Sequence, residues 1–180
     1  MLNLSKFTNN ETARTCEPCS YQRAENLSLL GVKSVLELCV GPSLKQLEMA
    51  YREFNITVTG NDIDPRWKDY YPGGKWIVGD ATEVKTAGFD AVVVAPPLSK
   101  NCSGRREDSL SLEQVFPKYD QFINLKNKVV VFVLPGRTLS LKEDKKQLYG
   151  FLSKLNGKIS VIPLKDKVTK YVDVYFERDL

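Results

Sequence analysis

The sequence contains no histidine. Imidazole is the usual general base, metal ligand and partner of a nucleophile, so mechanisms that depend on it are excluded. Cysteine is scarce: Cys16 and Cys19 form a Cys-x-x-Cys pair, while Cys39 and Cys102 stand alone. A four-thiolate zinc site normally has two close pairs, and a thioredoxin-like dithiol follows a strand, which this pair does not. We therefore expect no metal, and two ordinary thiols near the N-terminus rather than a zinc or redox site.

Long hydrophobic runs are also missing. Stretches such as 128–134 are too short to cross a bilayer, and residues 1–10 lack the basic-then-apolar order of a signal peptide. We expect a cytoplasmic protein that makes no membrane contact. Basic and acidic side chains are nearly balanced: 26 basic and 22 acidic side chains give a formal net charge of +4. This mild excess suits a polyanionic partner but is common in ordinary proteins.

The pattern of hydrophobic residues predicts one α/β domain. The chain has 180 residues, of which 42% are hydrophobic, enough for a single domain with residues 1–31 as an N-terminal helical extension. From Val32 onward, β-branched runs alternate with amphipathic stretches, which is typical of βαβ units. Strands are expected at 34–40, 56–62, 75–78, 90–95, 128–134, 158–163 and 171–177, and helices at 13–30, 44–54, 109–124 and 141–155.

Two details refine this architecture. Too few residues separate the last two strands for a helix, so they should pair as an antiparallel hairpin. The sequence thus predicts a doubly wound, seven-stranded, mostly parallel sheet with a C-terminal antiparallel hairpin strand and helices on both faces. Pro18 must either kink the first helix or mark its true beginning.

Polar and small residues follow the first three expected strands. The first strand ends in Glu37-Leu38-Cys39-Val40-Gly41-Pro42-Ser43, whose small residues let the backbone pass close to a ligand. Asp62 follows the second strand at the spacing where an acidic side chain reaches ribose hydroxyls, and Asp80 follows the third. Asp64 before Pro65 is instead typical of a helix start. The Gly-x-Gly-x-x-Gly pattern is absent, so NAD fits poorly.

In order, Glu37-x-Cys39-x-Gly41-x-Ser43, Asp62, Gly79-Asp80-Ala81 and Ala95-Pro96-Pro97-Leu98 resemble the motifs of the class I, Rossmann-like S-adenosylmethionine-dependent methyltransferases. The resemblance spans about Ala24 to Glu177. It implies S-adenosylmethionine as the cofactor. By this resemblance, the methionine part would be held by Glu37 and the turn of Cys39, Gly41 and Ser43, the ribose by Asp62, one face of adenine by Ile63, and the adenine edge by Asp80 and Ala81.

The sequence departs from the family at two places. Cys39 and Ser43 stand where the family usually has glycines, and both are less permissive of positive φ. We interpret Cys39 as a small buried thiol and not a nucleophile. Ala95-Pro96-Pro97-Leu98 resembles the family's (Asn/Asp)-Pro-Pro-(Tyr/Phe) signature for methylation of an amine nitrogen, but lacks its side-chain acceptor and its aromatic ring. We expect the main-chain carbonyls of Ala95 and Pro96, aimed by Pro96-Pro97, to accept the amine hydrogens instead.

A basic loop after the two prolines indicates the acceptor. Leu98, Lys100, Arg105 and Arg106 are the candidate substrate-binding residues; Lys45 and Arg137 follow other strands, and Trp67, Tyr70 and Tyr71 would either stack on a base or belong to the core. We expect methylation of a nucleic-acid nitrogen, in RNA rather than DNA. The alternatives are a catalytically silent S-adenosylmethionine-binding protein of the same fold and a small-molecule methyltransferase. The oligomeric state is not predicted.

Overall fold

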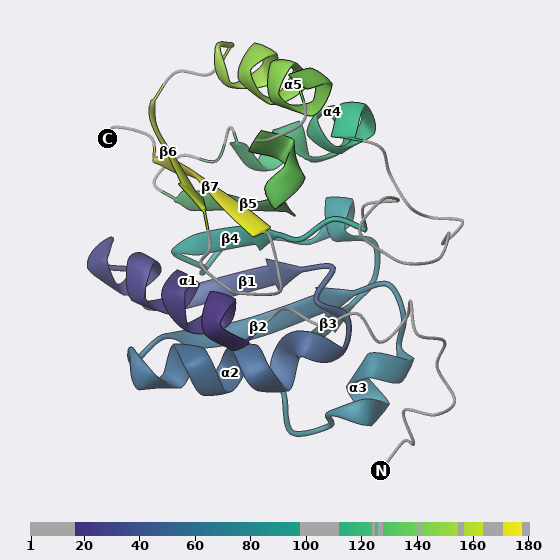
Figure 1. Ribbon diagram of the computed structural model, residues 1–180. Helices are drawn as coiled ribbons and strands as arrows, with labels where there is room; N and C mark the ends of the chain where they lie inside the picture. Colours follow the sequence, from purple (N-terminus) through teal and green to yellow (C-terminus); the bar gives the residue numbers. More distant parts are fainter. Residues whose placement is uncertain are drawn as a thin grey trace.

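The computed structural model describes residues 17–97, 112–123, 125, 128–139, 142–154, 157–163 and 171–177. Within these ranges seven strands form one sheet in the order β3-β2-β1-β4-β5-β7-β6 (Figure 1). The strands are β1 (Ser34–Leu38), β2 (Thr57–Asp62), β3 (Trp76–Val78), β4 (Ala91–Val94), β5 (Val129–Pro135), β6 (Lys158–Pro163) and β7 (Tyr171–Glu177). Strand β7 runs antiparallel to β5 and β6, and the other pairs are parallel. The predicted sheet and its hairpin are confirmed.

Helices cover both faces of the sheet (Figure 1). The helices α1 (Glu17–Leu29) and α2 (Leu44–Glu53) lie on one face, and α4 (Leu112–Ile123) and α5 (Lys142–Leu152) on the other. Side chains alternate along a strand, so each face of β1 belongs to a different core. Val35 packs with α1 and α2, whereas Leu36 and Leu38 pack with α4 and α5.

Sequence explains where most elements begin and end. Helix α1 begins at Glu17, so Pro18 falls in its first turn, where a missing N–H costs nothing. Helix α2 buries Leu44, Leu47, Ala50 and Tyr51 at helical spacing. Strand β1 ends two residues earlier than the expected 34–40, because Cys39 takes a positive φ of 59° and starts a turn.

Some elements differ from the expectation or lie beyond the described ranges. A short helix, α3 (Arg66–Tyr70), follows β2, in line with the helix start expected at Asp64-Pro65. The residue at its N-cap is Pro65 rather than Asp64, but Asp64 does accept the Arg66 backbone N–H at 3.0 Å. Three short 3-10 helices, η2 (Gly41–Ser43), η3 (Ala81–Glu83) and η4 (Gly136–Leu139), follow β1, β3 and β5. Residues 13–16 and 109–111 of two expected helices are outside the described part of the chain. Cys19 was expected to be an ordinary thiol, but it is disulfide-bonded, so that expectation is wrong.

The described residues contain neither a membrane-spanning helix nor a cluster of metal ligands. None of the helices is long and apolar enough to cross a bilayer. No group of three or more acidic, cysteine or histidine side chains in these ranges is placed to bind a metal ion.

Candidate functional site

The strand order reverses beside β1, which pairs with β2 on one side and with β4 on the other. Loops that leave such a switch point diverge and open a crevice at the carboxyl ends of the strands, where ligands bind in this class of sheet. The loop after β1 and the diproline segment after β4 both leave from this point. The Ala95 N–H donates to the Leu38 carbonyl at 3.3 Å, so the two predicted segments are neighbours.

The turn after β1 has two residues in the left-handed region. Cys39 has a φ of 59° and Gly41 a φ of 52°. The Val40 N–H donates to the Asn61 carbonyl at 3.0 Å, which ties the turn to the end of β2. Ser43 is buried in an ordinary right-handed conformation, with a φ of −81°. Serine in place of glycine therefore causes no backbone strain at position 43.

Asp62 lies at the centre of the site. One carboxylate oxygen, Oδ2, accepts the Gly41 N–H at 2.8 Å, and the other, Oδ1, accepts the Asp64 N–H at 3.0 Å. These two hydrogen bonds join the turn after β1 to the end of β2. The Asp62 side chain is half-buried. Sequence reasoning placed Asp62 beside a ribose but missed its bond to the turn. A charged acceptor held by two backbone donors is preorganised, and a carboxylate retains capacity for further donors.

Asp80 forms the second acidic position on this edge. Its Oδ1 accepts the Thr82 backbone N–H and the Thr82 hydroxyl, each at 2.8 Å. These hydrogen bonds lower the pKa of Asp80, so the side chain is ionised at neutral pH. The Gly79 N–H donates to the Asp62 carbonyl at 3.1 Å, and the Asn61 side chain donates to the carbonyls of Ile77 and Gly79. Hydrogen bonds therefore hold the carboxyl ends of β2 and β3 together.

An apolar surface lies beside these carboxylates. The Ile63 side chain is 64% exposed, and Val78, which pairs with Asp62 in the sheet register, is 44% exposed. Buried Ala81 follows Asp80. Exposed branched aliphatic side chains beside two acidic residues leave apolar area that a planar ring would cover.

Glu37 contacts helices α1 and α2. It is 1% exposed, and its Oε1 accepts the Tyr51 hydroxyl of α2 and lies 3.6 Å from Nη1 of Arg23 in α1. Burial raises the pKa of Glu37, while Arg23 and the Tyr51 hydrogen bond act in the opposite direction. Sequence reasoning missed both partners. Its predicted contact with the methionine part stays a prediction.

The Cys39 thiol lies on the opposite side of the turn. Its Sγ is 3.5 Å from the Tyr119 hydroxyl of α4. Burial raises the pKa of Cys39 to about 12, so the thiol is protonated at neutral pH. The raised pKa supports the interpretation of Cys39 as an unreactive thiol, which stays a prediction.

At the exit from β4, Pro96 is buried and Ala95 and Pro97 are half-buried. No backbone N–H of the described residues donates to the carbonyl of Ala95 or Pro96. Within the described ranges, these two oxygens therefore have no backbone donor. The predicted substrate residues Leu98, Lys100, Arg105 and Arg106 lie outside the described residues.

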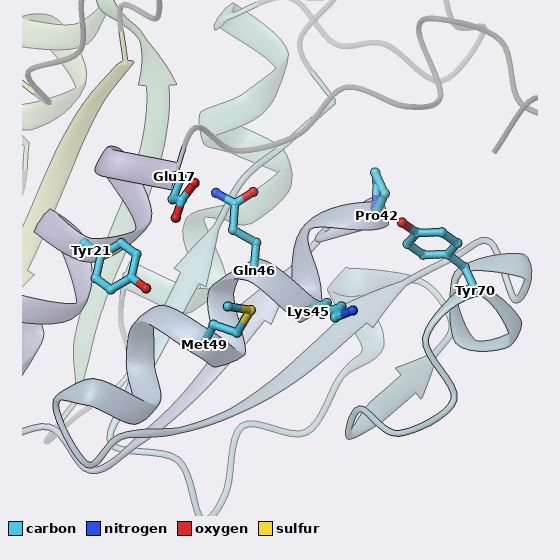
Figure 2. Close-up of a pocket in the computed structure, with 7 residues that line it drawn as sticks. All are labelled: Glu17, Tyr21, Pro42, Lys45, Gln46, Met49 and Tyr70. Atoms are coloured by element: carbon cyan, nitrogen blue, oxygen red, sulfur yellow. The ribbon is translucent and has the colours of Figure 1, made fainter. Parts of the chain in front are cut away.

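A pocket of about 170 Å³ lies beside the turn, between α1, α2 and α3 (Figure 2). It is lined by Glu17, Tyr21, Pro42, Lys45, Gln46, Met49 and Tyr70. Lys45 and Tyr70, both named above as candidates for nucleic-acid contact, therefore share one pocket.

The other two aromatic candidates do not line this pocket. Trp67 is only 1% exposed and belongs to the core. The Tyr71 hydroxyl donates to Glu48 at 2.6 Å.

Comparison with solved structures identifies the architecture. No protein-family model matches the sequence, and no curated protein sequence does. A methyltransferase from Pyrococcus furiosus superposes with a TM-score of 0.63 at 17% identity, over 89% of this chain and 83% of that one. The chain has the methyltransferase fold. Magnesium protoporphyrin IX methyltransferase from Synechocystis PCC 6803, solved with bound SAM, gives a TM-score of 0.62 at 10% identity, over 89% of this chain and 80% of that one.

A third structure with the methyltransferase fold is the E. cuniculi Mtq2-Trm112 complex. It superposes with a TM-score of 0.59 at 18% identity, over 94% of this chain and 99% of that one. The complex is responsible for methylation of the translation termination factor eRF1. One of these structures acts on a porphyrin and another on a protein. The methyltransferase fold therefore does not determine the acceptor.

Proposed function

We propose that this protein is an S-adenosylmethionine-dependent methyltransferase that modifies a nitrogen of a nucleic acid, RNA rather than DNA. The observation that carries the proposal is the arrangement of Asp62 at the switch point. This half-buried carboxylate is fixed by the Gly41 N–H and stands next to the exposed Ile63. The methyltransferase fold of the chain supports the cofactor and the type of reaction, but it does not bear on the acceptor.

The residues of the site fit the adenosyl part of this cofactor. Asp62 has acceptor capacity for ribose hydroxyls, Ile63 offers an apolar face to the adenine ring, and ionised Asp80 accepts from an amino group at its edge. Ala81 would contribute to the same edge. Cys39, Gly41 and Ser43 would border the methionine part. When bound, the cofactor supplies a methyl group activated by a sulfonium.

The chain would contribute position rather than a side-chain base. The carbonyls of Ala95 and Pro96, held by Pro96 and Pro97, would accept the N–H groups of an amine and direct its lone pair toward the methyl carbon. Orientation of this kind can lower a barrier substantially without a catalytic base. The proton of the new ammonium group would then leave to solvent.

The acceptor is inferred from charge and aromatic groups. Lys45 and Tyr70 line the pocket beside the cofactor turn and could contact a phosphate and a base (Figure 2). The basic residues Lys100, Arg105 and Arg106 follow the proposed catalytic segment in the sequence. The cytoplasmic location stays a prediction.

Calorimetry tests the cofactor proposal. Wild-type protein should bind both S-adenosylmethionine and S-adenosylhomocysteine. Asp62→Ala removes a charged acceptor and releases the Gly41 N–H, so it should weaken both at least about tenfold. Lys158→Gln, which breaks an exposed ion pair with Glu177, is the matched control and should bind as wild type does. If wild-type protein gives no heat with either ligand, the cofactor proposal is wrong.

Transfer of a tritiated methyl group tests the acceptor. Total RNA, DNA and a small-molecule extract are offered separately, and label is expected in RNA and absent with Asp62→Ala. Label confined to small molecules would replace the nucleic-acid proposal. Binding without any transfer would favour the second candidate, a silent cofactor-binding protein, for which Ala95 and Leu98 in place of the signature's functional side chains are the specific observation.

A further inference from the structure

Behind the cofactor turn lies a fully buried polar cluster, here called the Arg23 cluster. It consists of Arg23 from α1, Glu37 from β1, Tyr51 from α2 and Asp173 from β7, none more than 1% exposed. Nε and Nη2 of Arg23 donate to the two carboxylate oxygens of Asp173 at 2.7 and 2.9 Å. Nη1 of Arg23 lies 3.6 Å from Oε1 of Glu37. Four segments distant in sequence thus contribute to one buried polar cluster.

Stability alone is a poor explanation for the Arg23 cluster. Removing charges from water costs more than a buried ion pair usually returns, and apolar residues of similar size often pack as well or better. The cluster is also unbalanced, because two carboxylates share one guanidinium. Asp173 forms a bidentate salt bridge with Arg23, and Glu37 forms an ion pair with the remaining guanidinium nitrogen, Nη1.

The position of Glu37 connects the Arg23 cluster to the ligand site. Glu37 pairs with Gly60 of β2 and Val93 of β4, at the switch point, and lies two residues before the turn at Cys39. Among the described residues, both contacts of Glu37 fall on Oε1. Its second oxygen, Oε2, therefore retains capacity to accept from a cationic donor, provided that the carboxylate is ionised.

We propose that Arg23, fixed by Asp173, is a positioning residue that keeps Glu37 oriented and ionised so that Glu37 recognises the ammonium group of the cofactor's amino-acid part. This inference rests on the proposed function. Without the nearby guanidinium, a buried carboxylate favours its neutral form, which is a weak partner for an ammonium. Tyr51 alone would still hold Oε1 but would supply no positive charge.

A pair of ligands separates this role from general support of the fold. S-adenosylhomocysteine carries the amino-acid part, whereas 5′-methylthioadenosine has the same adenosine and a thioether but no amino-acid part. In Arg23→Gln/Asp173→Asn the charges of one buried pair are removed together and two amides remain to bond each other. This variant should bind S-adenosylhomocysteine at least about tenfold more weakly and 5′-methylthioadenosine less than about twofold more weakly. Lys158→Gln should change neither.

A cycle with Glu37→Gln shows whether Arg23 acts through Glu37. Glu37→Gln should reproduce the selective loss, and adding Arg23→Gln/Asp173→Asn to it should cause little further change in the affinity ratio of the two ligands. Equal weakening of both ligands, or a ratio that stays at the wild-type value, overturns the inference. If the double variant does not fold, Arg23→Lys takes its place, since lysine keeps the charge but cannot make the forked contact. Wild-type protein that binds neither ligand would refute the proposed function itself.

Discussion

At position 39 the backbone takes a conformation that glycine favours, although the residue is cysteine. The φ of 59° places Cβ close to the following carbonyl, which costs a residue other than glycine about 1–2 kcal/mol. The same turn holds Gly41, whose N–H is bonded to Asp62. Cys39 therefore carries strain at the point where the candidate site is built, and its thiol lies 3.5 Å from the Tyr119 hydroxyl.

Two substitutions of Cys39 separate strain from packing. Cys39→Ala and Cys39→Gly both remove the contact between the thiol and the Tyr119 hydroxyl, but only glycine relieves the positive φ. We expect the glycine variant to be more stable than the alanine variant by about 1 kcal/mol in urea denaturation. Equal stability of the two would show that the backbone at position 39 relaxes without strain.

At the scale of elements, β2 can approach the turn after β1 only because Gly60 has no side chain. A Cβ at Gly60 would lie 2.9 Å from both Leu44 Cδ2 and Val40 Cγ1, and both neighbours are buried. Leu44 begins α2 and Asp62 ends β2. The close approach of these two elements therefore sets the distance that lets Asp62 accept from Gly41.

Alanine at Gly60 should therefore destabilise the protein, by about 1–3 kcal/mol, because it overpacks a closed contact. Gly150 is the matched control: it lies in α5, exposed, with nothing within 4 Å of an added Cβ. Gly150→Ala should stabilise by about 0.5–1 kcal/mol through helix propensity. Urea denaturation measures both. A Gly60→Ala variant as stable as wild type would mean that Leu44 can move away, so the distance is not fixed by packing.

The sequence predicts some of these elements well because their signals are local. Runs such as Ala91–Val94, buried along their whole length, can only be central strands, and the short link before β7 permits only a hairpin. Only the start of α3 was predicted, at Asp64-Pro65, because five residues are too few to show a helical period. Asp62 was predicted as a site residue from its spacing, whereas its bond to Gly41 depends on how β1 and β2 align.

The Arg23 cluster was not predicted because its members are distant in sequence. Arg23 and Asp173 are 150 residues apart, and neither stands in a recognisable motif. The available signal was weak: Asp173 is a single acidic residue inside the apolar strand β7. A buried charge in such a strand indicates that a partner exists but not which residue it is.

At the scale of the whole molecule, the two cores on either side of the sheet enclose weak acids that titrate in the alkaline range, among them Cys39, Tyr51 and Tyr175. Burial raises the pKa of Cys39 to about 12. It also raises the pKa of Tyr51 and of Tyr175, with further increases from Glu37 and Asp173 respectively. Each of these groups keeps its proton in the folded state to a higher pH than it would in the unfolded chain.

The sign of the pH dependence follows from proton linkage. A group whose pKa is higher in the folded state contributes stability that is complete below its unfolded pKa, which is about 8.5 for cysteine and about 10 for tyrosine, and is lost as pH rises toward the folded value. For Cys39 the loss approaches about 1.4 kcal/mol per pH unit above pH 8.5 or so. The two tyrosines add their own loss only above about pH 10.

We therefore expect the free energy of unfolding to fall by about 1–2 kcal/mol between pH 8 and pH 10, and to fall more steeply beyond. Urea denaturation of wild type and Cys39→Gly at both pH values isolates the contribution of Cys39, since other titrating groups are common to the two proteins. The variant should lose less stability than wild type over this interval. Equal losses would show that the thiol meets solvent in the folded state, and would remove the reason for treating it as unreactive.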